Sequence, residues 1–317
     1  MGVPTLGCDC AVCTSTDPRD RRLRPSVLLR WPTAEVLEAS DHETESAPSL
    51  PQSYSGKDGN PQVPTGAEIK KNSGADFGIK ADSTSLRERI VVIDTGPDFR
   101  EQALRAKLTR LDAVFYTHAH ADHILGLDDL RPLTFTFFRN GQPIPLYAAP
   151  ETAKVLEQVF DYTFSPNSTY ANRARVHLEP LAPIVPIHGV DFLRIPILHG
   201  EQGISGFRFG NTAYLTDVSA IPESSFALLE GLDHLILSAL RHKPHPNHAT
   251  VEQAVGWARR IGAKQTWFTH IAHELGHEET NGTLPENIRL AYDGLTLEVN
   301  LATENRKSRT AGAAASA

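Results

Sequence analysis

Four metal-binding side chains fall within six residues of this chain, directly after a short apolar run. The stretch "LDAVFYTHAHADH" carries the pattern His-x-His-x-Asp-His from His118 to His123. Imidazole and carboxylate groups bind first-row metal ions, but four of them in six residues cannot all reach one small ion. A turn at a strand end would send His118 and His120 one way and Asp122 and His123 another. The pattern therefore predicts two neighbouring metal sites, and its alternative is a polar, solvated loop.

Three further candidate ligands also follow strand-like runs. His199 comes after "DFLRIPIL", Asp217 after "TAYLT" and His270 after "QTWFT". Sites in α/β folds collect at the carboxyl ends of strands. A single histidine in this position is more often structural, but the shared placement predicts that all three join the His118–His123 motif. Asp94 in "VIDTGPDF" also ends a strand, and we expect it to support a ligand or a turn.

The spacing of apolar residues after Arg89 predicts the fold class. Short β-branched and aromatic runs alternate with segments of helical pattern, near Pro150–Phe160, Glu223–Leu229 and Thr250–Ile261. Thr250 has the chemistry of an N-cap for the last of these. Alternating strands and helices indicate an α/β domain.

The cysteines raise a separate question, because all of them lie in "CDCAVC". Cys8, Cys10 and Cys13 are odd in number, which excludes a fully paired disulfide framework. Their spacing fits thiolates around one ion, and a structural zinc site needs four ligands, so a fourth must come from elsewhere. The alternative is three ordinary reduced thiols. Clustered thiols of either kind suit a reducing compartment, and we expect a cytoplasmic protein.

Composition limits the partners of this chain. Its 317 residues carry a formal net charge of −7, which argues against a broad nucleic-acid-binding face. No apolar run approaches the roughly 20 residues that span a bilayer, so we expect no membrane association. Residues 32–85 are rich in Ser, Pro, Gly and charged residues, which predicts a disordered insertion in one domain of residues 1–301. Residues 302–317 are expected to form a disordered tail.

Taken together, "THAHADH", the three later ligands, "GVPTLGCDCAVC" and "FTHIAH" resemble the metallo-β-lactamase superfamily. The resemblance covers Gly2–Trp31 and Arg89 to about Val299, and it implies a four-layer αββα sandwich. The cysteine cluster and "FTHIAH" make the chain most similar to the phosphodiesterase family of the carbon–phosphorus lyase pathway, which hydrolyses a ribose cyclic phosphate. Relatives usually have a strand ahead of "GVP", so we expect the first strand to be missing and leave open whether Met1 is the true start.

The resemblance implies a role for each candidate residue. Two divalent ions, Mn²⁺ or Zn²⁺, would be held by His118, His120 and His199 on one side and by Asp122, His123 and His270 on the other, with Asp217 bridging them. A structural Zn²⁺ would be held by Cys8, Cys10, Cys13 and His273. His248 in "RHKPHPNHAT" would protonate the leaving oxygen, and Asp122 would also take part in catalysis.

The function implied by the resemblance is metal-dependent hydrolysis of a small, cyclic phosphodiester. The alternatives are a tRNA 3′-processing type of nuclease, a lactonase or thioesterase, and a catalytically silent metabolite-binding member of the fold. The expected partner is a small-molecule phosphodiester substrate, with nucleic acid disfavoured by the acidic charge. Relatives are often dimers, so a homodimer is an expectation by analogy.

Overall fold

The computed structural model of the chain describes residues 2–33, 88–134 and 142–301. The insertion predicted at residues 32–85 lies almost entirely outside this part, and the tail predicted at residues 302–317 lies wholly outside it. The described residues up to Trp31 and from Arg89 onward belong to one compact unit. The elements below belong to that unit, apart from the two strand ends at Pro32 and Glu88.

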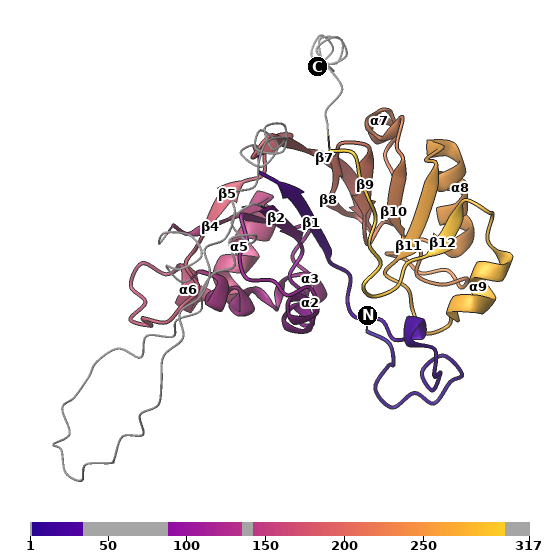
Figure 1. Cartoon of the computed structure of the whole chain (residues 1–317), viewed down its shortest axis with the longest axis horizontal. Coiled ribbons are helices and arrows are strands. Elements are labelled where there is room, and N and C mark those ends of the chain that lie inside the picture. The colour runs from indigo at the N-terminus through magenta and orange to yellow at the C-terminus, as the bar shows by residue number, and fades with distance from the viewer. Residues whose placement is uncertain (1, 34–87, 135–141, 302–317) are drawn as a thin grey trace, which may run out of the picture. The chain divides into compact units, whose positions relative to one another are not determined.

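Two β-sheets form the centre of the described structure (Figure 1). The first has five strands in the order β1-β2-β3-β4-β5, which are Val27–Pro32, Glu88–Ile93, Ala113–Phe115, Ile144–Ala148 and Val176–Pro180. The second has seven strands in the order β12-β11-β10-β9-β8-β7-β6. In chain order from β6 to β12 these are Ile184–Ile187, Val190–His199, Gln202–Phe209, Thr212–Leu215, His234–Ser238, Gln265–Thr269 and Ile288–Leu290.

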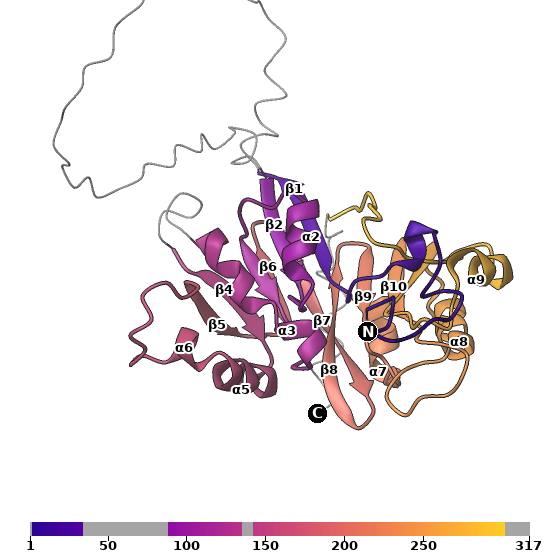
Figure 2. The ribbon, with the colours of Figure 1, turned by 90° about the horizontal axis from the view of Figure 1, so that it is seen from below.

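Helices cover the outer face of each sheet. The five-stranded sheet packs against α2 (Phe99–Arg105), α3 (Ala121–Ile124), η3 (Leu127–Thr134), α5 (Pro150–Val159) and α6 (Asp161–Phe164). The seven-stranded sheet packs against α7 (Glu223–Phe226), η4 (Ala227–Leu229) and α8 (Val251–Ile261). Two short elements, η1 (Pro18–Asp20) and α9 (His277–Thr283), lie together beside the second sheet (Figure 2). None of the helices in the described ranges is long and apolar enough to cross a membrane.

A third apolar cluster fills the space between the two sheets. Phe115 of β3 stacks on Phe192 of β7 at 4.6 Å between ring centroids and meets Phe207 of β8 edge-on at 5.2 Å. Val91 and Ile93 of β2 contribute to the same cluster from the first sheet. The order from outside to outside is helices, sheet, sheet, helices. The four-layer αββα sandwich expected from the sequence is therefore confirmed.

The strand directions explain where a site forms. Strands β2 to β5 are parallel, and so are β9 to β12. Strand β7 is antiparallel to β8, which is antiparallel to β9, so β7 runs in the same direction as β9. In each sheet, the carboxyl ends of several strands therefore lie at the same end of the sheet, where the following loops bring polar side chains together.

Local sequence signals determine where helix α8 begins and ends. Thr250 caps α8 by accepting a hydrogen bond from the backbone N–H of Gln253, whose side chain bonds back to Thr250. Gly262 ends the same helix with φ 71°. These are the start and stop signals that favour a helix between two strands, and they confirm the helix expected after Thr250.

Candidate metal centres

All seven predicted ligands of the dinuclear site lie close together at the ends of β3, β7, β9 and β11. Their ligand atoms form two groups, in each of which the atoms lie within 4.8 Å of one another. One group holds His118, His120, His199 and Asp217, and the other holds Asp122, His123 and His270. The division is the one that the resemblance implied for two separate ions.

Asp217 faces both groups. Its Oδ2 lies 3.6 Å from Nε2 of His118 and 3.4 Å from Nε2 of His123. Its Oδ1 lies 3.3 Å from Nε2 of His270. The side chain is almost fully buried, at 2% exposure. One carboxylate with oxygens directed at both sets of imidazoles has the position of a bridging ligand.

The donor atoms fit divalent metal ions. Nε2 of His118, His123 and His270 are buried, and each lacks a hydrogen-bond partner among the described residues. A buried polar atom without a partner costs about 1–3 kcal/mol, which coordination to an ion would offset. Burial lowers the pKa of His118 to about 2, so its ring is neutral, as a metal ligand must be. Buried, unpartnered nitrogens beside carboxylates are therefore suited to hold metal.

The opposite ring nitrogens are held in place by hydrogen bonds. Nδ1 of His123 donates to Oδ2 of Asp94 at 2.7 Å. Thr117 Oγ1 also donates to Oδ2 of Asp94, so it can accept from Nδ1 of His118 at 3.0 Å. These bonds place the ring protons on Nδ1 and leave Nε2 free to bind an ion. Asp94 therefore supports the ligands, as the sequence led us to expect.

His199 is oriented by two backbone carbonyls. Its Nδ1 lies 2.7 Å from the carbonyl oxygen of Asp217 and 2.7 Å from that of Asn247. These carbonyls belong to the turns after β9 and β10, so three neighbouring loops are tied together at one ring. Nothing in the residue type of Asn247 indicates this role, because a backbone carbonyl accepts hydrogen bonds whatever the side chain is.

Replacing Asp94 by asparagine should weaken metal binding by about 10- to 100-fold, as expected for partners that orient metal-binding histidines. The physical reason is that the neutral amide is a poorer acceptor for Nδ1 of His123 and does not fix its tautomer. Competition with a chelator of known affinity measures the change. Asp191→Asn, a carboxylate in β7 outside both ligand groups, is the matched control. Equal affinities of Asp94→Asn and the wild type would contradict this role.

Backbone conformation also aims the ligands. Asp94, Asp217 and His270 have φ of 63°, 55° and 52°, in the left-handed region that residues other than glycine rarely occupy. Asp94 and His270 directly follow β2 and β11, and Asp217 lies two residues beyond the end of β9. Such conformations cluster at functional sites, where the surrounding structure maintains them. They turn the side chains at the strand ends toward the common centre.

A close approach at Gly96 fixes the His118–His123 turn against β2. A Cβ at this position would lie 2.2 Å from the carbonyl oxygen of Asp122, so no larger residue fits. The neighbouring Thr95 N–H donates to the carbonyl oxygen of His123 at 2.8 Å. The glycine in "DTGPDF" therefore positions the metal-binding turn.

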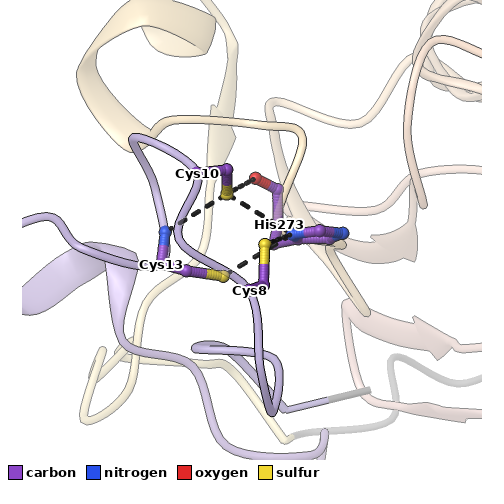
Figure 3. Close-up of side chains that lie close together, drawn as sticks. All are labelled: Cys8, Cys10, Cys13 and His273. Carbon is purple, nitrogen blue, oxygen red and sulfur yellow. Dashed lines mark hydrogen bonds between the residues drawn. The ribbon is translucent and has the colours of Figure 1, made fainter.

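The three cysteines surround His273, which comes from the loop after β11 (Figure 3). Nδ1 of His273 lies 3.2 Å from Sγ of Cys8, 3.4 Å from that of Cys10 and 3.5 Å from that of Cys13. Zn–S bonds of about 2.3 Å and Zn–N bonds of about 2.0 Å at tetrahedral angles require N···S separations of about 3.5 Å. The four side chains thus have the spacing of a closed Cys₃His zinc site.

Backbone N–H groups donate hydrogen bonds to two of the sulfur atoms, and one of these bonds favours the thiolate of Cys10. The backbone N–H of Cys13 points to Sγ of Cys10 at 3.5 Å, and that of Thr5 points to Sγ of Cys13 at 3.3 Å. The first of these bonds is the main cause that lowers the pKa of Cys10 to about 6. A thiolate is the form that binds zinc, so this backbone favours coordination.

A buried ion pair fastens the cysteine segment to the same loop. Arg22 donates to Asp20 at 3.1 Å and to the carbonyl oxygens of Ala272 and Leu275 at 3.2 and 2.6 Å. Asp20 also accepts from the backbone N–H of His277 at 2.8 Å. These contacts hold the N-terminal segment against the turn that carries His270 and His273. Sequence reasoning did not find this pair.

His248 lies beside the seven predicted ligands of the dinuclear site. Its ring centroid is 4.8 Å from that of His270, with the rings stacked, and 4.7 Å from that of His199. A ligand atom of its ring lies within 4.8 Å of those of Asp217 and His270. Burial, followed by the charge of His270, lowers its pKa to about 3, and its Nδ1 has no hydrogen-bond partner among the described residues.

Comparison with known proteins decides the family. Residues 89–271 match the family model described as the beta-lactamase superfamily domain. The chain belongs to the β-lactamase superfamily. The resemblance seen in the sequence is thereby confirmed, and this fold implies binding of divalent metal.

Individual relatives add detail. The structure of a new diphosphatase from the PhnP family is similar to this chain at 44% identity, with a TM-score of 0.73, over 96% of this chain and 95% of that one. An octanoyltransferase of Porphyromonas gingivalis is 30% identical over 93% of this chain and 48% of its own length. A ribonuclease Z of Methanosarcina mazei is 33% identical over 30% of this chain and 31% of its own. The chain thus spans about half or less of these two curated relatives.

Proposed function

We propose that the chain is a dinuclear-metal-dependent hydrolase of small phosphodiesters, with a cyclic phosphodiester as its preferred substrate. The observation that carries the proposal is the position of Asp217, whose oxygens lie 3.3–3.6 Å from the buried, unpartnered Nε2 atoms of His118, His123 and His270. Two ions, Mn²⁺ or Zn²⁺, would share this carboxylate. A third ion, Zn²⁺, would be structural in the Cys₃His site.

Similarity to the PhnP-family diphosphatase supports the substrate class. It extends over nearly the whole of both chains at 44% identity, so the matched region includes the part of this chain that carries the candidate site. A diphosphatase acts on a bond to phosphorus, which favours phosphoryl substrates over lactones and thioesters. The cyclic form rests on the sequence resemblance to the carbon–phosphorus lyase phosphodiesterase family.

The side chains would divide the work of hydrolysis. Divalent ions supply Lewis-acid chemistry, polarising phosphoryl oxygens and lowering the pKa of water to about 7. Asp122 and Asp217 would balance the positive charge, and Asp217, whose oxygens face both ligand groups, would fix the groups relative to each other. Asp94 and Thr117 hold the rings of His123 and His118 in their binding tautomers. His248 would give a proton to the departing oxygen.

His248 needs a substrate to act in this way. With its pKa lowered to about 3 by burial, the ring is neutral at pH 7 before substrate binds. A phosphodiester anion beside the ring favours the protonated form. His248 would therefore take up its proton together with the substrate.

Replacing His248 by alanine should lower the rate by about 10²- to 10⁴-fold for diesters with an alkoxide leaving group, the usual contribution of general acid catalysis. A p-nitrophenolate leaving group needs no proton, so its release should slow by less than about 10-fold. Comparing kcat for the two substrates measures the difference. Equal losses with both would contradict a proton-donating role.

A panel of substrates tests the proposed function itself. The metal-loaded chain should hydrolyse bis(p-nitrophenyl) phosphate and, with a higher kcat/KM, a ribose cyclic phosphate. A diphosphate diester, a tRNA precursor, a lactone and an acyl thioester form the comparison set. Failure on both phosphodiesters would contradict the proposal. Cleavage of the tRNA precursor alone would instead favour the nuclease alternative, which the ribonuclease Z relatives support over about a third of the chain.

A further inference from the structure

The loop between β10 and α8 is tied down over the dinuclear group at several points. Leu240 N–H donates to the carbonyl oxygen of Ala249 at 3.0 Å, which closes the base of the loop. The carbonyl oxygen of Asn247 bonds to Nδ1 of His199, one of the candidate ligands. A Cβ at Gly200 would lie 2.6 Å from Oδ1 of Asn247, which shows how closely the loop packs there. Side chains of this loop are therefore held at a fixed distance from the metal centre.

One side chain of the loop has its protonation defined by geometry. The backbone N–H of Asn247 donates to Nδ1 of His245 at 3.2 Å. A backbone N–H can only donate, so Nδ1 of His245 acts as an acceptor and carries no proton. In a neutral imidazole the proton then lies on Nε2. His245 consequently offers one N–H donor, at Nε2.

The ring that carries this donor packs beside the ring of His248. The ring of His245 packs 4.9 Å from the ring of His248, which itself stacks on His270. His245 is half-buried, and the hydrogen bond found for its ring among the described residues is the one at Nδ1, which leaves Nε2–H open to solvent or a ligand. An oriented donor without a protein partner at the edge of a metal centre is available to a ligand.

We propose that Nε2–H of His245 donates a hydrogen bond to a non-bridging oxygen of the substrate's phosphoryl group. This inference rests on the proposed function, because it assigns a contact to the same substrate. A phosphoryl group presents acceptor oxygens only, which a single N–H donor complements. The neutral ring adds direction without adding charge to a centre already crowded with imidazoles and cations. His245 is thus a substrate-binding residue, distinct from the proton donor His248.

Binding of inorganic phosphate to the metal-loaded chain tests this contact without requiring turnover. In isothermal titration, His245→Phe should bind phosphate about 10-fold or more weakly than the wild type. This variant keeps a ring against His248 but lacks the donor. His245→Gln places an amide N–H near the position of Nε2 and should recover most of the affinity. His242→Phe, at an exposed histidine paired with Glu252 at 2.6 Å, should bind as the wild type does. Metal content and melting temperature verify that each variant is folded and loaded.

The outcomes separate this inference from the proposed function. Phosphate affinity in His245→Phe within twofold of the wild type would overturn the inference, and so would a metal-loaded wild type that binds no phosphate at millimolar concentration. If the affinity falls as expected but no phosphodiester is hydrolysed, the contact stands and the proposed function fails. With an active enzyme, His245→Phe should raise KM for the diester by a larger factor than it lowers kcat, whereas loss of a proton donor would act mainly on kcat.

Discussion

Replacing Asp217 by asparagine should reduce phosphodiester hydrolysis by about 10³-fold or more, since sharing charge with two ions is worth several kcal/mol in the transition state. The substitution keeps the shape of the side chain but removes its negative charge. Nε2 of His118, His123 and His270 would then face a neutral amide at 3.3–3.6 Å. We also expect the two active-site ions to bind more weakly. The metal content of the variant after dialysis measures this loss.

Asp233→Asn is the matched control for this variant. Asp233 directly precedes β10 and pairs with Lys264 at 2.7 Å, outside both ligand groups. Its replacement should leave rate and metal content unchanged. Full activity of Asp217→Asn with two retained ions would show that the carboxylate does not bridge them.

Replacing His273 by alanine should remove one zinc ion and lower the melting temperature by about 10 °C or more. Structural zinc contributes many kcal/mol to folding, and about 1 kcal/mol shifts the melting temperature of a domain this size by about 2–4 °C. The loss would release Cys8, Cys10 and Cys13 from the loop that also carries His270. Elemental analysis and thermal unfolding at fixed metal concentration measure both effects.

His273→Cys distinguishes loss of the ion from loss of the side chain. Four cysteines also form a closed zinc site, so this variant should keep the zinc and most of the stability. Unchanged zinc content in His273→Ala would mean that the fourth ligand lies elsewhere. Equal destabilisation in both variants, with zinc retained in His273→Cys, would assign the effect to packing.

The sequence predicted the parts of the site that depend on residue type and spacing. His118, His120, Asp122 and His123 were recognised because metal ligands rarely occur so densely, and His199, Asp217 and His270 because they follow apolar runs. The fourth partner of the cysteines, by contrast, came only from the family resemblance. Nothing in "FTHIAH" alone separates His273 from an ordinary surface histidine.

The parts that the sequence did not reveal depend on backbone geometry. Left-handed φ at Asp94, Asp217 and His270 has no signature in residue type, because none of them is glycine. Two backbone groups of Asn247 also have no signature in the sequence. Its carbonyl orients His199, and its N–H defines the tautomer of His245. Only the folded chain shows these contacts.

Some strands were also difficult to predict, because tertiary packing requires residues that weaken the local strand pattern. Strand β8 (Gln202–Phe209) contains two glycines, which weaken its strand pattern. A Cβ at Gly206 would lie 2.4 Å from Cδ2 of Leu215 and 3.0 Å from the carbonyl oxygen of Tyr214 on the neighbouring strand, so a larger residue would have to displace both. Tertiary packing thus requires a residue that local propensity disfavours. Strands β3, β9 and β11 were predicted, since their runs are apolar and lack glycine.

The most direct test of the dinuclear centre is the number of metal ions per chain. Protein purified without chelator or affinity-tag metal would be weighed by native mass spectrometry and analysed for its elements, beside the Asp217→Asn and His273→Ala variants. We predict about three ions in the wild type, with one zinc lost in His273→Ala and the other two weakened in Asp217→Asn. A single zinc in the wild type, lost only with His273, would mean that the group around Asp217 holds no metal and would contradict the proposed hydrolase.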